Sequence, residues 1–254
     1  SSCHRAHAST VGIAKEIPSV SGLLLEKEIF ALESTLANPT PPIVAIVGGA
    51  KIETKITLLL SLVKLVDHLI IGGGMANTFL FANNKEIGRS ICEKDKARLI
   101  KKIYDQAKTF NCNIHLPLDL VCAPDLDTNE STSIHDADNC PSNQMILDAG
   151  PKTILNIRSI LENCSTLIWN GPLGAFETPP FDNATTKTAK VAARLTKAKK
   201  LKSVAGGGDT ISALKSTSVF NDFTYISNAG GAFLEWLERK PLPGLNVLEG
   251  NASS

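Results

Sequence analysis

The sequence predicts an α/β fold, a Rossmann-like, doubly wound parallel sheet of about six strands. Short runs rich in β-branched residues recur along the chain, and most of them end at a glycine cluster. Segments with apolar residues at helical spacing lie between these runs. Strands that alternate with helices of about 10–15 residues form right-handed β-α-β units, whose strands are parallel and buried. The strand-like runs are residues 43–47, 68–71, 113–120, 166–169, 202–204 and 223–226.

The segments between the runs predict the helices and one surface excursion. Apolar residues recur at helical spacing over 56–63, in a helix expected to begin near Lys51. Met75 opens the next helix, and a charged helix spans about 94–110. Residues 124–144 are rich in Asp, Asn, Ser, Thr and Pro, so they predict a surface excursion with a small hairpin.

The segment before the first strand differs from this alternation. Residues 22–36 carry apolar side chains at helical spacing and predict one helix, which Asn38-Pro39 closes. Pro39, Pro41 and Pro42 then mark a boundary into the sheet domain, because the residue before a proline is disfavoured in a helix.

Composition is that of an ordinary globular protein. The chain has 43% hydrophobic and 20% charged residues and a formal net charge of +1. This balance supports neither nucleic-acid binding nor a membrane-surface role. No run of about 18 apolar residues predicts a membrane span, and the residues after Ser1 lack the layout of a secretory signal. The six cysteines form no C-x-x-C pair, so we expect reduced thiols in a cytoplasmic protein.

Glycine clusters at several strand ends predict an anion site. In an open parallel sheet, ligands bind outside the carboxyl ends of the strands. Glycine lets a phosphate approach the backbone there, and the following helix N-terminus offers unpaired N–H donors. Any single cluster is equally well explained by a tight turn or close helix–sheet packing. Several clusters at one edge favour phosphate binding.

Charged and polar residues follow three of these strand ends. Lys51 and Lys55 would share one face of the first helical turn, where two cations oppose the dipole unless an anion sits there. The alternative is two solvated lysines. Asp209 and Thr210 suit either helix capping or a carboxylate that holds Mg²⁺ against phosphate oxygens. The loop 169–177 offers an amide, apolar surface and a carboxylate for phosphate, base and ribose, although a buried Trp or Phe is more often core.

Other motifs are absent or unassigned. The G-x-x-x-x-G-K-[ST] spacing of a Walker A loop and the G-x-S-x-G elbow of serine hydrolases do not occur. His4 and His7 flank Arg5 in a polar segment that is explained as an exposed terminus, and a third metal ligand is lacking nearby.

These motifs, in their order and spacing, resemble the phosphoglycerate kinase family over nearly the whole chain. The family has an N-terminal domain for phosphoglycerate, a C-terminal domain for Mg-ADP or Mg-ATP, and a helix between them. The resemblance implies that residues 1–21 end the first domain, 22–38 form the interdomain helix, 39–240 bind nucleotide and 241–254 are a C-terminal tail. The basic cluster of the phosphoglycerate site would lie upstream of Ser1. The motifs are HRAHAS at 4–9, GGAK at 48–51, LIIGGGMA at 69–76, WNGP at 169–172, GGGDT at 206–210, GGA at 230–232 and KPLPG at 240–244.

The resemblance also implies which residues serve the transferring phosphoryl group. Lys51 and Lys55 would bind the nucleotide phosphates and this group, and Gly230 and Gly231 would present backbone donors to it. Arg5 would reach the phosphoglycerate from the other side of the cleft. Such roles fit phosphoryl transfer, which depends on positioning and charge neutralisation more than on a covalent catalyst.

The nucleotide and its metal would occupy the remaining positions. Asp209 would serve Mg²⁺, with Thr210 beside it. Asn170 would face the phosphates, Leu173 the nucleoside and Glu177 the ribose. The pocket would be completed by Gly49, Ala50, Gly73, Gly74, Ile146, Gly207 and Gly208.

Several positions depart from the commonest family pattern. Thr54 stands where many members have Asp, Ile146 where many have Gly beside the adenine, and Asn228-Ala229 where many have Thr-Gly; Phe233 replaces Ser. The resemblance is to the bacterial type, in which some members look similar at Thr54, Ile146, Ala229 and Phe233 but not at Asn228. A β-branched residue at 146 could trim the pocket and weaken selectivity for adenine.

The activity that the resemblance implies is reversible phosphoryl transfer from 1,3-bisphosphoglycerate to Mg-ADP, giving ATP and 3-phosphoglycerate. The expected cofactors are Mg²⁺ and ATP/ADP, and the expected partners are the nucleotide, the phosphoglycerate and the missing N-terminal domain. We expect a cytoplasmic monomer, weakly active or inactive alone, with no nucleic-acid or membrane partner. Thr54 and Asn228 leave open a non-catalytic nucleotide-binding module. A dinucleotide oxidoreductase is disfavoured, because no G-x-G-x-x-G is followed by an acidic residue at the required distance.

Overall fold

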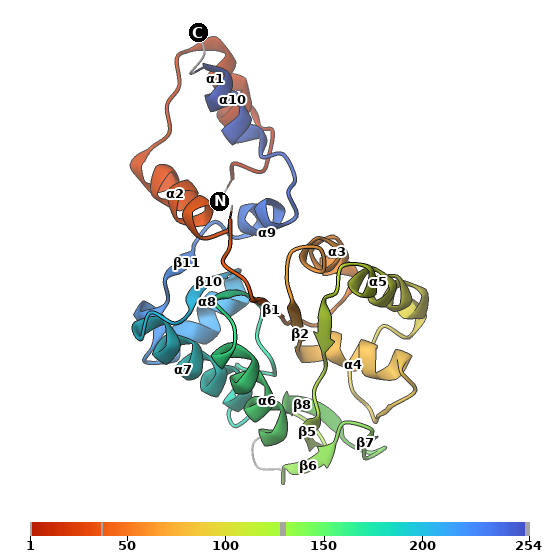
Figure 1. The fold of residues 1–254 in the computed structure, drawn as a ribbon. Coiled ribbons are helices and arrows are strands. Elements are labelled where there is room, and N and C mark those ends of the chain that lie inside the picture. Colours follow the sequence, from red (N-terminus) through yellow and green to blue (C-terminus); the bar gives the residue numbers. More distant parts are fainter. Residues whose placement is uncertain (1, 37, 128–130, 252–254) are drawn as a thin grey trace.

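The computed structural model describes residues 2–36, 38–127 and 131–251, and a six-stranded parallel sheet lies at its centre (Figure 1). The predicted α/β fold is therefore confirmed. The predicted segments 22–38, 124–144 and 241–254 each fall partly outside the described residues. The strand order is β11-β10-β9-β1-β2-β4, formed by β1 (Ile43–Val47), β2 (His68–Ile71), β4 (Asn113–His115), β9 (Thr166–Asn170), β10 (Lys202–Gly206) and β11 (Tyr225–Ser227).

Helices cover both faces of this sheet. Strand β1 is apolar throughout because it is buried on both sides: Ala45 and Val47 join one core, and Val44 and Ile46 join the other. The first core also contains side chains of α3 (Ile56–Leu62), α4 (Gly73–Ala82), α5 (Ala97–Thr109) and α9 (Gly231–Leu237). The second contains side chains of α6 (Pro151–Glu162), α7 (Asn183–Lys197) and α8 (Gly208–Lys215).

A second, antiparallel sheet was not predicted. The run 113–120 was expected as one strand, which is wrong: β4 ends at His115, and β5 (Asp119–Ala123) belongs to another sheet. Pro117 lies between them and offers no N–H to a ladder. β5 pairs with β6 (Ser133–Asp136) and with β8 (Met145–Ala149), and β3 (Glu86–Ile87) pairs in parallel with β7 (Asn139–Cys140).

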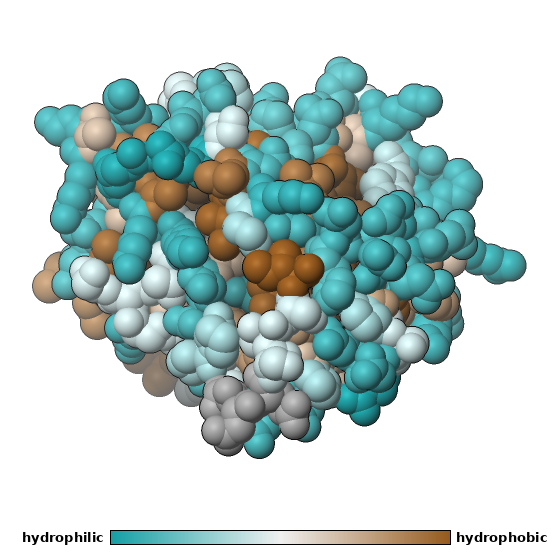
Figure 2. Space-filling model, turned by 90° about the horizontal axis from the view of Figure 1, so that it is seen from below, coloured by the Kyte–Doolittle hydropathy of each residue, from teal (hydrophilic) through white to brown (hydrophobic). Residues whose placement is uncertain are grey.

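Viewed from below, the surface of the molecule is largely hydrophilic. A small group of hydrophobic residues is exposed near its middle (Figure 2).

Three element boundaries differ from the prediction. A 3-10 turn (Glu53–Lys55) precedes α3, which begins only at Ile56, so Lys51 and Lys55 do not share a helical face. Ile52 is fully buried, so the chain turns into the core before the helix begins. Helix α4 begins two residues before Met75, and β11 begins after Phe223, which follows a 3-10 turn.

The terminal segments lie together above the sheet (Figure 1). The predicted helix at 22–36 is confirmed as α2 (Leu23–Leu36). Residues of the expected C-terminal tail form α10 (Pro243–Asn251), which lies beside α1 (Ile13–Glu16); Gly244 N donates a 2.8 Å hydrogen bond to Cys3 O. None of the helices in the described residues has the length and apolar character needed to span a bilayer.

Candidate functional site

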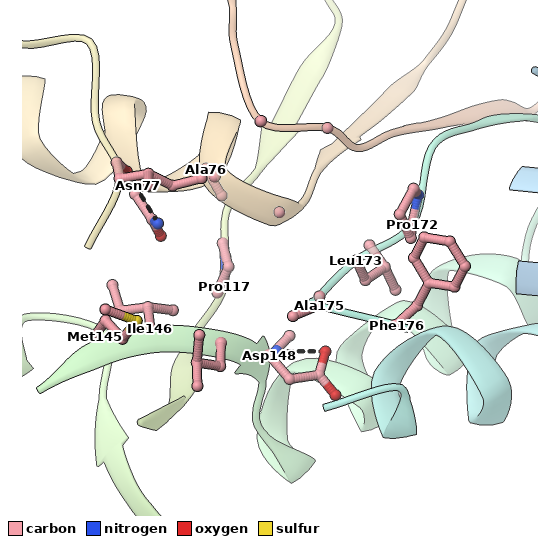
Figure 3. A pocket seen from close by; sticks show the side chains of 18 of the residues that line it. Ala76, Asn77, Pro117, Met145, Ile146, Asp148, Pro172, Leu173, Ala175 and Phe176 are labelled. Atoms are coloured by element: carbon pink, nitrogen blue, oxygen red, sulfur yellow. Dashed lines mark hydrogen bonds between the residues drawn. The ribbon is translucent and has the colours of Figure 1, made fainter. Parts of the chain in front are cut away.

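A cavity of about 320 Å³ opens at the carboxyl ends of the parallel strands. Its lining includes Gly49 and Ala50 after β1, the first turn of α4 after β2, and the loop that follows β9. Figure 3 shows Met145 and Ile146 of β8 on one side of this space, Leu173 and Phe176 on the other, and Asn77 entering from α4. Mostly apolar walls with a few polar groups are typical of a small-molecule site.

The glycines differ in whether they pack against neighbouring backbone or leave it open. A Cβ on Gly48 would lie 1.7 Å from Pro172 O, and one on Gly171, whose φ is +98°, would lie 2.2 Å from Gly48 O. These glycines let two strand ends pack directly together. By contrast, a Cβ on Gly208 or Gly230 would meet nothing within 4 Å. The open backbone at these two positions leaves room for a ligand.

Lys55 is turned into the protein and is not a solvated lysine. Its Nζ donates to Gly48 O at 2.6 Å and to Asn170 Oδ1 at 2.7 Å, while Asn170 Nδ2 donates to Gly206 O at 2.7 Å. These bonds join the ends of β1, β9 and β10. Burial lowers the pKa of Lys55 to about 8, and the nearby Asp209 carboxylate partly opposes that shift. Lys51, in contrast, is exposed.

Asp209 lines the cavity from the first turn of α8, and it does not cap this helix. Gly207 occupies the N-cap position with φ +99°, and no side chain caps the helix. No hydrogen bond or ion pair involves the exposed Asp209 carboxylate among the described residues. Thr210 instead has a structural role, because its Oγ1 accepts a 2.6 Å hydrogen bond from Gly171 N.

The Asp209 carboxylate suits a Mg²⁺ ion that is bound jointly by the protein and by the phosphates of a nucleotide. The described part of the chain contains no group of three or more His, Cys, Asp or Glu side chains able to hold a metal. Mg²⁺ is commonly held by one or two carboxylates together with phosphate and water oxygens. A single unpaired carboxylate beside open backbone matches that pattern.

Most of the predicted site residues fall into three places, whereas Lys51 and Gly208 are exposed and lie outside the cavity lining. The cavity lining contains Gly49, Ala50, Gly73, Gly74, Ile146, Leu173, Glu177 and Asp209. Lys55, Asn170, Gly207 and Thr210 form the hydrogen-bonded support beside it. The exposed Arg5 donates to His4 Nε2 at 3.4 Å, and that nitrogen lies 3.1 Å from a Cβ built on Gly231. The N-terminal segment therefore approaches the start of α9, next to Gly230.

Sequence reasoning missed several lining residues, of which Asp148 is the most unusual. Asp148 is 2% exposed, and its carboxylate accepts from Ala149 N and Ala184 N, each at 2.9 Å. Burial raises the pKa of Asp148 to about 7 despite these bonds. The strand-to-helix signal at Gly150-Pro151 could have revealed β8 and this acid at its end. The other missed residues are Ala76, Asn77, Ile91, Pro117, Leu126, Met145, Leu147 and Ala149, whereas Pro172, Gly174, Ala175 and Phe176 belong to the predicted loop 169–177.

Comparison with known proteins gives a consistent result. The family model described as phosphoglycerate kinase matches residues 1–240. The chain is 52% identical over 249 residues to a phosphoglycerate kinase from Sphingopyxis alaskensis and 53% identical over 249 residues to one from Jannaschia sp.; each match covers 98% of this chain and 63% of the relative. The solved phosphoglycerate kinase from Coxiella burnetii superposes with a TM-score of 0.92 at 39% identity, over 98% of this chain and 64% of that one.

A more distant structure shares the fold. The phosphoglycerate kinase from Pyrococcus horikoshii superposes with a TM-score of 0.81 at 27% identity, over 99% of this chain and 62% of that one. The chain thus spans a little under two thirds of the length of the relatives it matches.

Proposed function

The chain belongs to the phosphoglycerate kinase family, and on that premise we propose that it provides the Mg-nucleotide half of a phosphoryl-transfer site. The observation that carries the proposal is the Lys55–Asn170 contact, which fixes a half-buried cation where the ends of β1, β9 and β10 meet. A partly desolvated ammonium with neutral partners favours an anion beside it, and a nucleotide phosphate supplies one.

Each part of the nucleotide has a counterpart in the cleft. The apolar walls at Ile146 and Leu173 would hold the base, and Glu177 would accept from the ribose. The glycines at 49, 73, 74, 207 and 208 would face the phosphates. Asn170 was expected to face them too, but it is buried and both of its amide atoms are hydrogen-bonded, so it would hold Lys55 in place instead. Asp209 would hold Mg²⁺, which neutralises charge on the phosphate oxygens.

The transferring group would lie between Lys55 and the start of α9. Gly230 and Gly231 would offer backbone N–H groups to it, and Arg5 would reach the acceptor from the N-terminal side. In the whole protein we propose reversible phosphoryl transfer from 1,3-bisphosphoglycerate to ADP in the cytoplasm. A further domain would supply the rest of the phosphoglycerate site.

The substitutions Thr54 and Asn228 support an alternative, a nucleotide-binding module without catalysis. Thr54 Oγ1 donates to Lys51 O at 3.0 Å, so it closes the local turn. A threonine hydroxyl engaged in the turn is not available to a metal. Asn228 is exposed, and the structure gives no reason for its replacement of Thr.

Calorimetric titration with Mg-ADP tests the nucleotide proposal. We expect saturable binding that weakens at least about tenfold in Asp209→Ala or when Mg²⁺ is removed, since a charged metal contact is lost. Asp105→Ala, which removes an exposed carboxylate on α5, serves as the control and should bind normally. Absence of binding at millimolar Mg-ADP, or equal binding by Asp209→Ala, would contradict the proposal.

A further inference from the structure

Residues 91–93 connect the cavity wall to the turn that carries Lys55. Ile91 lines the cavity, and a Cβ on Gly74 would lie only 2.5 Å from Ile91 Cδ1. Glu93 lies two residues later. Its N–H donates a 3.2 Å hydrogen bond to Oγ1 of Thr78, a buried residue of α4. The backbone at Glu93 is therefore anchored to a core helix.

The Glu93 carboxylate reaches across to the turn between β1 and α3. Glu93 Oε2 accepts from Ile52 N at 2.5 Å and from Glu53 N at 3.4 Å. Ile52 and Glu53 immediately precede Lys55. The bond to Ile52 is short, and carboxylate acceptors form stronger hydrogen bonds than neutral ones.

The turn is closed by bonds of Thr54 and Lys55 within it, but its first N–H groups, at Ile52 and Glu53, are bound from outside by Glu93. No side chain caps the 3-10 turn Glu53–Lys55 or helix α3, which follows it directly. Lys55 leaves this turn to reach Gly48 O and Asn170 Oδ1. A small shift of the 52–53 backbone would break those two short contacts.

We propose that Glu93 is a positioning residue of the nucleotide site, which fixes the backbone at Ile52 and Glu53 and so holds Lys55 at the phosphates. The inference rests on the proposed nucleotide function. Glu93 does not line the cavity, so its effect reaches the phosphates through the backbone and Lys55 alone. It should therefore act on the phosphate part of a ligand and leave the base part unaffected.

The test compares Mg-ADP with adenosine, which lacks phosphates, in calorimetric titrations of the wild-type chain and its variants. For Glu93→Ala we expect about tenfold weaker Mg-ADP binding and adenosine binding within about twofold of wild type, since a charge-assisted contact is lost. Glu93→Gln keeps an acceptor oxygen and should recover most of the affinity. Glu53→Ala removes a carboxylate of the same turn that, within the described part of the chain, pairs with Lys96 alone, and it should bind both ligands normally.

Three results would overturn the inference: normal Mg-ADP binding by Glu93→Ala, equal loss of both ligands, or the same loss in Glu53→Ala. Amide hydrogen exchange tests the positioning role of Glu93 separately from the proposed nucleotide function. Faster exchange at Ile52 and Glu53 in Glu93→Ala, with β1 unchanged, is expected. Unchanged exchange at these two amides would overturn the positioning role alone, whereas wild-type chain that binds neither ligand would contradict the nucleotide function itself.

Discussion

At the scale of single residues, Lys55 combines a charge with an unfavourable environment. Its Nζ has two neutral oxygen partners, Gly48 O and Asn170 Oδ1, and its pKa is lowered to about 8 by burial. An ammonium group in this setting is partly deprotonated slightly above neutral pH. A bound phosphate favours the charged form and raises the pKa again.

This linkage predicts proton uptake when Mg-ADP binds. At pH 8.5 Lys55 is mostly neutral in the ligand-free protein, so binding of Mg-ADP should take up about half a proton or more. At pH 7 Lys55 is already mostly charged, so the proton uptake should be smaller. Calorimetry in buffers of different ionisation enthalpy measures this quantity. Lys55→Arg should abolish the uptake, because arginine stays charged at both pH values. Equal proton uptake by wild type and Lys55→Arg would assign the proton to another group.

Asp148 predicts a pH dependence of stability with a defined sign. Its folded pKa of about 7 lies above the unfolded value near 3.8, so between these values the folded state binds more protons than the unfolded state. The free energy of unfolding should therefore fall as pH rises from 4 to 7, by on the order of 4 kcal/mol from this group. Asp148→Asn should remove that slope, which urea titrations at several pH values would reveal. The same slope in both proteins would contradict the assignment.

At the scale of elements, the N-terminus of α6 is held by one buried carboxylate. Asp119 is 1% exposed, and its oxygens accept from Lys152 N at 2.9 Å, Thr153 N at 2.8 Å and Thr153 Oγ1 at 2.7 Å. The same helix start carries a surface ion pair, Lys152–Asp136, whose side chains are 66% and 65% exposed. The contributions of a buried and an exposed carboxylate to stability can therefore be compared at one helix start.

We predict that Asp119→Ala lowers the free energy of unfolding by about 2 kcal/mol or more, because three donors lose a charged acceptor. Asp136→Ala should change it by less than about 0.5 kcal/mol, as is typical of exposed ion pairs. The midpoint of urea unfolding measures both changes. Similar effects of the two substitutions would show that α6 is not fixed by Asp119.

The elements that could be predicted from sequence are those with local signals. Strand β1 was predictable because an uninterrupted apolar run followed by glycine is typical of a strand buried on both faces. Strand β8 reads Met-Ile-Leu-Asp-Ala, which contains an acid and one β-branched residue, and its pairing with β5 depends on contacts distant in sequence. The start of α3 likewise depends on Glu93, 41 residues from Ile52.

The part of the site that follows strand ends was also predictable, because it too has local sequence signals. Lys55, Asp209 and the glycines follow strand ends, and a parallel sheet brings such ends to one edge. Asp148 accepts from Ala184 N and Glu93 from Ile52 N, and no local pattern reveals these distant partners.

At the scale of the whole molecule, we predict that this chain binds nucleotide but transfers phosphate poorly. It spans 63% of the length of its relatives, and Arg5 is the only side chain here proposed to bind phosphoglycerate. Without further groups to orient the acceptor, the rate advantage of positioning is largely lost. A coupled assay with 1,3-bisphosphoglycerate and Mg-ADP should give at most about 1% of the turnover of a full-length relative. Near-normal turnover would show that the acceptor site is already present.

Mapping Mg-ADP on the ¹⁵N-labelled chain by NMR chemical-shift perturbation locates the nucleotide directly. The proposed nucleotide site lies at the carboxyl edge of the six-stranded sheet. Perturbed amides should cluster at residues 48–55, 73–77, 145–148, 171–177 and 207–210, where the cavity and its hydrogen-bonded support lie. Perturbations confined to another surface, such as the second cavity beside α2 and α10, would contradict the account.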